Sequence, residues 1–179
     1  MFRHLFSKKK ILIIGIFLII VGISLLSYFK INEYLDIKKH TKIIDRSYYS
    51  GETNKYDNLK YIIIPKENIK RLIMDNASKE VLDQNYVGLV SGNLNSETGN
   101  IILAGHNIKA VFHSLHQLKI GSEIILKDQK LEKYEVINKY ETLKNDSNVL
   151  KTVTDIKQLT LITCTKDPNY RLIVIAKKK

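Results

Sequence analysis

The sequence predicts an all-β globular domain preceded by one N-terminal transmembrane helix. Apolar runs of roughly four to eight residues, a length that suits strands better than helices, recur between residues 61 and 176. Polar turns separate these runs, and only two short helices are expected, one beginning near Ser78 and one over residues 109–118. Many short strands with little helix indicate a barrel or a sandwich.

Seven apolar runs are the strand candidates of this domain. They lie at residues 61–64, 69–74, 101–104, 123–126, 134–140, 159–163 and 172–176. The 44% content of hydrophobic residues is enough for a core of ordinary size, and the sequence contains no internal repeat. The length of 179 residues suits one compact domain with an extension.

Residues 11–29 form a nearly unbroken apolar stretch. At about 1.5 Å per residue, this stretch is just long enough to cross a hydrocarbon core of roughly 30 Å. Lysines at positions 8–10 predict that residues 1–10 stay in the cytoplasm. A cleaved signal peptide is the alternative, but positions 27–30 offer no small-x-small cleavage site, so an uncleaved signal anchor is favoured. Residues 30–58 are then a stalk, and residues 59–179 a folded domain outside the cell membrane.

The formal net charge of +11 does not indicate a nucleic-acid-binding protein. Five of the 29 basic residues flank the apolar stretch, and all 18 acidic residues lie beyond it. The other basic residues are scattered, without the stripe of basic and aromatic side chains that follows phosphates. The charge fits attraction to an anionic lipid or envelope surface, so the membrane is an expected partner and nucleic acid is not.

The single cysteine, Cys164, excludes an intramolecular disulfide and a zinc site built from several cysteines. In a domain expected outside the cell, a lone cysteine is either buried and inert or present for its thiol. His106, His113 and His116 could suggest a metal site, but no carboxylate or cysteine completes the set at ligand spacing. We therefore expect no metal.

Three residues at strand ends are candidates for catalysis, and each also has a structural interpretation. Cys164 ends the run at 159–163 and could be a small buried hydrophobic side chain. His106 follows the run at 101–104, where a histidine is commonly a hydrogen-bonded structural residue. Arg171 precedes the last run, where its charge could simply be solvated.

The spacing of these residues favours a shared site. Only six residues separate Cys164 from Arg171, and a connection this short normally joins antiparallel neighbours. Both residues should then lie at one rim of the sheet. His106 also lies at the C-terminal end of its strand, after Gly105, which allows close approach of the backbone. A thiol, an imidazole and a guanidinium at one rim supply a nucleophile, a proton carrier and a group that stabilises an anion.

The segments that hold these residues resemble the sortase family. The run Thr-Leu-Ile-Thr-Cys at 160–164 matches the family's Thr-Leu-x-Thr-Cys motif, with Cys164 in the position of the nucleophile. The segment from Asn100 to His106 is similar to the one that ends in the catalytic histidine, and Arg171 stands where the family places its arginine. Upstream segments at 61–69 and 78–88 resemble the first strands and helix, so the resemblance covers about residues 60–176.

The resemblance implies an eight-stranded sortase-type β-barrel with short helices, and a cysteine transpeptidase. Such an enzyme cleaves a C-terminal sorting signal of the Leu-Pro-x-Thr-Gly kind through a thioester on Cys164. His106 would protonate the leaving amine and deprotonate the incoming one, and Arg171 would stabilise the oxyanion or position the signal. Thr163, next to the nucleophile, would support the geometry of the site, and this chemistry would need no cofactor. The implied partners are a surface protein or pilin that bears a sorting signal, and a peptidoglycan precursor or another amine as acceptor.

Two other functions stay open at this point. One is a catalytically silent, membrane-tethered β-domain that binds envelope components. The other is a hydrolytic cysteine peptidase that releases its product to water. The resemblance is closest to class A and class D sortases, and it leaves a class B enzyme or a minimal variant open.

Overall fold

The computed structural model describes residues 8–49, 58–150 and 155–179. Expectations for residues 1–7 of the N-terminal segment and for residues 50–57 of the stalk lie outside the described residues. The chain divides into two compact units, Met1–Asp36 and Ile37–Lys179, and each is described by itself. The boundaries predicted for the anchor, the stalk and the folded domain stay predictions.

The first unit is the N-terminal part of helix α1 (Lys8–Tyr49). The helix is long and apolar enough to cross a membrane. Its large apolar side chains over residues 11–29 are exposed, as expected where a single helix faces lipid. The predicted N-terminal apolar helix is therefore present.

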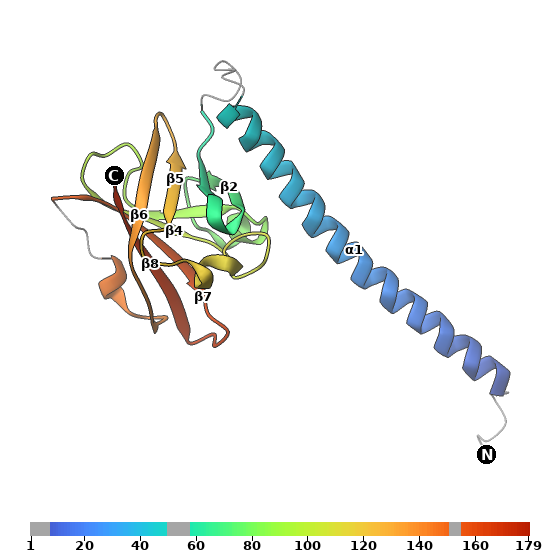
Figure 1. Ribbon diagram of the computed structural model, residues 1–179. Coiled ribbons are helices and arrows are strands. Elements are labelled where there is room, and N and C mark those ends of the chain that lie inside the picture. Colours follow the sequence, from blue (N-terminus) through green and yellow to red (C-terminus); the bar gives the residue numbers. More distant parts are fainter. Residues whose placement is uncertain (1–7, 50–57, 151–154) are drawn as a thin grey trace. The chain divides into compact units, whose positions relative to one another are not determined.

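The second unit contains a closed barrel of eight strands (Figure 1). The strands are β1 (Tyr61–Ile64), β2 (Ile69–Met74), β3 (Val87–Ser91), β4 (Gly99–Ala104), β5 (Glu123–Lys127), β6 (Leu131–Leu143), β7 (Lys157–Cys164) and β8 (Tyr170–Lys178). Short helices connect them: η1 (Pro65–Glu67), α3 (Lys79–Asp83), η2 (His113–Gln117) and η3 (Ser147–Leu150). The order around the barrel is β1-β2-β3-β4-β7-β8-β6-β5. This architecture confirms the prediction of an eight-stranded barrel with short helices.

Strand β1 is buried on both faces, which explains its uninterrupted apolar sequence. Ile62 and Ile64 point into the core of the barrel. Tyr61 and Ile63 form a second apolar cluster with Ile44 from the last turns of α1. Part of the segment predicted as a stalk is therefore helical and belongs to the barrel unit, because it covers the outer side of β1.

Two strand pairings bring three strand ends to one rim of the barrel. Strands β4 and β7 are parallel, so their C-terminal ends lie side by side. Strands β7 and β8 are antiparallel, so β8 begins where β7 ends. The antiparallel pairing predicted from the six-residue connection is present. The residues that follow β4 and end β7 therefore lie near the start of β8.

A buried ionic cluster lies at the other end of β7. The Glu132 carboxylate is 2.6 Å from the Lys157 ammonium and 3.0 Å from the Lys178 ammonium, and it accepts a 2.9 Å hydrogen bond from the Tyr134 hydroxyl. The Lys157 ammonium also donates to the carbonyl oxygen of Leu94 at 2.8 Å. Burial raises the pKa of the Glu132 carboxyl, but hydrogen bonds from Lys157, Lys178 and Tyr134 outweigh burial and lower it to about 2.

Candidate active site

Cys164 is the last residue of β7, and it is half-buried. Its register partner on β8 is Arg171. Directly opposed residues of an antiparallel pair project to the same face of the sheet. The pairing therefore places the thiol and the guanidinium on one face at one rim.

His106 reaches this rim through the end of β4. The backbone N–H of Gly105 donates to the carbonyl oxygen of Ile162 at 3.1 Å, two residues before Cys164. A Cβ atom on Gly105 would lie 2.7 Å from the Phe112 ring and 2.8 Å from the Val111 side chain. Only glycine fits this close approach, so the residue before His106 is fixed by packing.

Thr163 connects the two strand ends. Its buried hydroxyl donates a 2.8 Å hydrogen bond to the carbonyl oxygen of Gly105. The residue before Cys164 is thereby bonded to the residue before His106. That Thr163 supports the geometry of the site stays a prediction.

The side chains of His106 and Arg171 have partners of their own. Nε2 of His106 lies 3.3 Å from Oδ1 of Asp83 at the end of α3. Nη1 of Arg171 donates to the carbonyl oxygens of Pro168 at 3.0 Å and Tyr170 at 2.9 Å. Within the described parts of the chain, neither side chain hydrogen-bonds Cys164. The strands thus bring the three residues to one rim, while the side chains are held by other groups.

Asp83 is a residue of the site that the sequence did not indicate. It ends a one-turn helix whose first turn is capped by the Ser78 side chain, which accepts from the N–H of Val81. A hydrogen bond from Lys79, and after it one from His106, lowers the pKa of the Asp83 carboxyl. Asp83 is therefore the charged partner of the His106 ring.

Two cavities lie at this rim, one lined in part by Cys164 and the other by Arg171. We call the larger, of about 530 Å³, the Cys164 cavity, and the smaller, of about 140 Å³, the Arg171 cavity. The Cys164 cavity is lined by Asn107, His113, His116, Glu141 and residues 164–167. The Arg171 cavity is lined by parts of β6, β7, β8 and η3, including Ile162, Ile173, Val149 and Leu150. Cys164 and Arg171 are register partners, yet each lines a different cavity.

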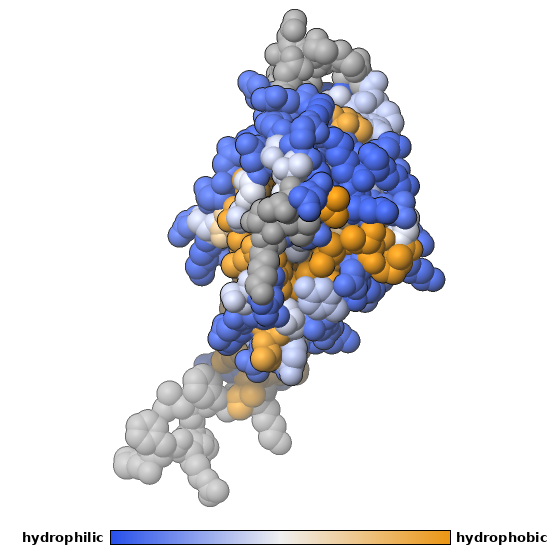
Figure 2. All heavy atoms as spheres, turned by 90° about the vertical axis from the view of Figure 1, so that its left-hand side faces the viewer, coloured by the Kyte–Doolittle hydropathy of each residue, from blue (hydrophilic) through white to orange (hydrophobic). Residues whose placement is uncertain are grey.

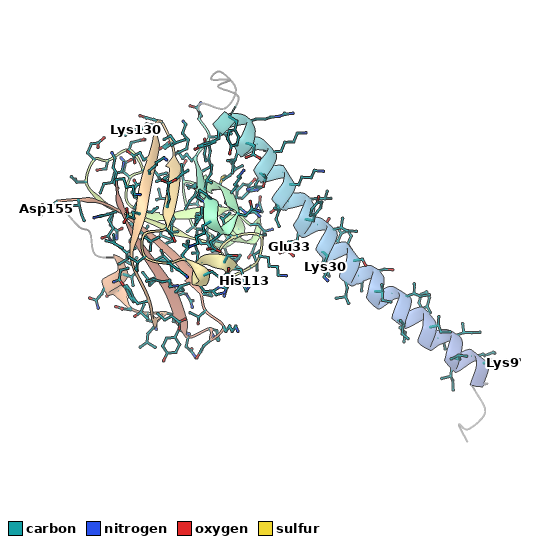
Figure 3. The ribbon with its side chains drawn as sticks, in the orientation of Figure 1. Lys9, Lys30, Glu33, His113, Lys130 and Asp155 are labelled. Carbon is teal, nitrogen blue, oxygen red and sulfur yellow. The ribbon has the colours of Figure 1, made fainter. Side chains whose placement is uncertain are left out.

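The histidines that could have suggested a metal site make hydrogen bonds instead. Nδ1 of His113, which is labelled in Figure 3, lies 3.0 Å from Oδ1 of Asn107. Nδ1 of His116 contacts the carbonyl oxygen of His113. Among the described residues, no three histidine, cysteine or acidic side chains are grouped closely enough to hold a metal ion.

Comparison with known proteins places this arrangement in a family. A model of the sortase domain matches residues 62–179. No curated protein matches the chain significantly. The structure resembles that of a sortase D5 transpeptidase from Clostridium perfringens, with a TM-score of 0.64 and 26% identity over 82% of this chain and 98% of that chain.

Two further structures share the fold at lower identity. Sortase A of Listeria monocytogenes has a TM-score of 0.61 and 22% identity over 67% of this chain and 86% of that chain. Sortase C-1 of Actinomyces oris has a TM-score of 0.63 and 24% identity over 73% and 81%. Similar structures thus come from several sortase classes, and the class of this chain stays open. Because the family model spans most of the sequence and nearly the whole barrel, the chain belongs to the sortase family of cysteine transpeptidases.

Proposed function

We propose that this chain is a membrane-anchored sortase that cleaves a C-terminal sorting signal of the Leu-Pro-x-Thr-Gly kind and transfers the acyl group to an amine. The observation that carries the proposal is the pairing of Cys164 with Arg171, beside the strand end that leads to His106. A nucleophile, a cation and a proton carrier converge there on one rim. Acyl transfer through a covalent intermediate needs these three groups.

In the proposed first step, the Cys164 thiolate attacks the carbonyl carbon before the scissile bond. The negative charge that develops on the carbonyl oxygen is stabilised by Arg171. His106 gives a proton to the leaving amine, the C–N bond breaks and a thioester remains on Cys164. In the second step an amine attacks the thioester, the C–S bond breaks and His106 takes up a proton.

The contacts of Arg171 support its proposed role. Two backbone carbonyl oxygens hold Nη1, which fixes the plane of the guanidinium. A guanidinium carries five N–H donors, so donors remain for a substrate oxygen. Lysine has a single ammonium and cannot be held at one position while it donates from another.

The Arg171 cavity is a suitable place for the sorting signal. Apolar walls from Ile162, Ile173 and Leu150 stand beside the guanidinium. Polar groups of Thr142, Lys144 and Asp146 also line this cavity, and apolar walls with a few polar groups are typical of ligand pockets. Figure 2 shows that hydrophobic side chains also form a band across an otherwise mainly hydrophilic side of the molecule. The leucine and proline of a sorting signal would find apolar contacts in the Arg171 cavity.

Helix α1 supports a location of this chain in the cell membrane. A single N-terminal span with lysines before it supports a cytoplasmic N-terminus and a catalytic domain outside the membrane. The proposed partners are surface proteins or pilins that bear a sorting signal, with a peptidoglycan precursor or another protein amine as acceptor. This is the usual context of a Gram-positive cell wall.

Trapping of the thioester tests the proposal. The full chain in detergent micelles is incubated with a set of sorting-signal peptides, with and without an added amine, and analysed by mass spectrometry. We expect a peptide adduct on Cys164, no adduct in Cys164→Ala, and a loss of about 10²–10³ in rate in Arg171→Lys. Hydrolysis alone, even with amine present, would identify a peptidase. No adduct with any peptide, together with slow alkylation of Cys164, would identify a silent domain.

A further inference from the structure

The Cys164 cavity has the chemistry of an amine site. We propose that it binds the acceptor substrate as an ammonium ion and removes the proton that keeps the amine from attacking. This inference rests on the proposed function, because it assigns the second substrate of the same reaction. It is carried by the position of the cavity, the charge of its lining and the hydrogen bonds of its two histidines.

The position of the cavity fits a second substrate. In the second half of the reaction, the acceptor amine must reach the carbonyl carbon of the thioester on Cys164. Cys164 lines the larger cavity, and its register partner Arg171 lines the other. A signal held beside Arg171 would therefore leave the Cys164 cavity open to the acceptor. The cavity of about 530 Å³ has room for an amino acid or a short peptide end.

The charges of the lining favour a cation. Glu141 projects from β6, and Asp167 lies in the connection from β7 to β8. Oδ1 of Asp167 accepts a 2.9 Å hydrogen bond from the N–H of Asn169, which fixes the position of this carboxylate. Lys166 is the cation among the lining residues, and Lys166 is exposed like Glu141 and Asp167. The two carboxylates therefore outnumber the positive charge around the cavity.

Two histidines in the lining are oriented as proton acceptors. The Asn107 Oδ1 and the His113 carbonyl oxygen can only accept, so Nδ1 of His113 and Nδ1 of His116 must both donate. In a neutral ring with the proton on Nδ1, Nε2 is the acceptor. The ring centroids are 5.3 Å apart, so both rings can serve one bound group. Nδ1 donates in the neutral ring and in the imidazolium alike, so these hydrogen bonds leave Nε2 as the ring nitrogen that can exchange a proton with a bound group.

The proposed step moves two protons and exchanges one bond at the thioester carbon. The bound ammonium gives one proton to Nε2 of His116 or His113, which later passes it to water. The neutral amine then attacks the thioester carbon, a C–N bond forms and the C–S bond to Cys164 breaks with release of the thiolate. The second proton of the attacking nitrogen goes to His106, which had given its own proton to the first leaving amine. The product is an amide, and the enzyme returns to its starting state.

The test separates attack by amine from formation of the thioester. The full chain in detergent micelles is given a sorting-signal peptide and Nα-acetyl-lysine amide, whose side chain is an ammonium ion. The ratio of amide product to hydrolysed product is measured per thioester formed. We expect Glu141→Gln to lower this ratio roughly threefold to fivefold, as for loss of one exposed charge pair. Glu135→Gln, the same change on the same strand outside the cavity, should keep the ratio of the wild type.

Hydroxylamine, which is uncharged at pH 7.5, provides a second measurement. With hydroxylamine, the ratio of transfer product to hydrolysed product should be equal in the wild type and Glu141→Gln. Raised salt should lower this ratio for the lysine derivative but not for hydroxylamine. The proposed acceptor site would be overturned if the lysine derivative gave the same ratio of amide to hydrolysed product in the wild type and Glu141→Gln. It would also be overturned if salt changed this ratio equally for both nucleophiles. Absence of any thioester in the wild type would instead overturn the proposed function, so the two failures are distinct.

Discussion

The Thr163 hydroxyl donates a 2.8 Å hydrogen bond to the carbonyl oxygen of Gly105. The bond joins β7 to the residue that follows β4, one position before Cys164 on one side and one position before His106 on the other. Strand pairing alone extends only to Ala104 and Ile162. The hydroxyl therefore extends the connection between the strands to the residues proposed to react.

Thr163→Val should remove this connection with little change in shape. We expect kcat to fall roughly tenfold or more because a small displacement of His106 is costly. Loss of the buried partner should lower the free energy of unfolding by about 1–3 kcal/mol. Thr160→Val is the matched control, since the buried Thr160 hydroxyl on the same strand donates to Asn100 at 2.8 Å, away from the rim. If the two variants lose activity equally, the Thr163 bond only stabilises the fold.

Asp83→Asn should weaken the hold on the His106 ring. The Asp83 carboxylate lies 3.3 Å from Nε2 of His106, and hydrogen bonds from Lys79 and His106 lower the pKa of this carboxyl, so it stays ionised at neutral pH and loses its charge only in acid. We expect kcat/KM to fall about twofold to fivefold at neutral and alkaline pH, and the variant to match the wild type only where Asp83 itself is protonated. Lys79→Ala, which removes the other partner of Asp83, is the control. Equal kcat/KM in the wild type and Asp83→Asn at neutral pH would contradict the positioning role.

Ile44→Ala should destabilise the barrel unit although residue 44 lies in the segment before it. Ile44 is fully buried against Tyr61, Ile63 and Ile125. Removal of such a side chain lowers the free energy of unfolding by about 2–5 kcal/mol. Ile120→Ala, the same change at a side chain that is 64% exposed, should stay within about 0.5 kcal/mol. Urea unfolding of a fragment of residues 37–179 measures both values.

Removal of all of α1, in a fragment that begins at residue 56, should destabilise the barrel more than Ile44→Ala does. It would lack all of α1 and expose the outer side of β1 to water. We expect a lower urea midpoint than for the fragment of residues 37–179. An equal midpoint would show that α1 does not stabilise the barrel, and the predicted domain start at residue 59 would then be sufficient.

Acid should unfold the barrel through Glu132. The folded-state pKa of about 2 lies below the ordinary value of 4.5, so the carboxylate contributes stability that is fully present above about pH 4.5. The contribution is lost as the pH falls toward 2, and it amounts to about 3 kcal/mol for a pKa difference of this size. In Glu132→Gln, urea unfolding should depend less on pH between 5 and 2. An unchanged slope would show that other carboxyl groups control acid unfolding.

Strands, and the placement of Cys164 and Arg171 at one rim, could be predicted from local sequence patterns. β1 and β2 coincide with apolar runs, since strands covered on one or both faces leave a direct record in the sequence. The proximity of Cys164 and Arg171 followed from one short connection. β3 was not among the seven runs because Gly88 interrupts its apolar sequence. A Cβ atom at Gly88 would lie 2.5 Å from Cα of Ala77, a contact that no local pattern reveals.

The remaining features depend on contacts between distant segments. Asp83 is 23 residues from His106, and the short helix that carries it has no sequence feature that points to β4. Ile44 lies in a polar segment without a sustained helical period, so its burial depends on the outer side of β1. The Cys164 cavity combines η2, β6 and the β7–β8 connection, and only the closed barrel brings these together.

Closure of the barrel also limits how a peptide can be recognised. Many domains bind extended peptides by adding them as a further strand to a free sheet edge, where backbone hydrogen bonds supply much of the affinity. In this chain the described strands pair around a full circle, so that mode has no free edge to use. A sorting signal would have to be selected by side chains, with the apolar residues of η3 prominent among them. Exchange of η3 between related chains would then change which peptide is selected without altering the β4, β7 and β8 ends where the proposed reaction takes place.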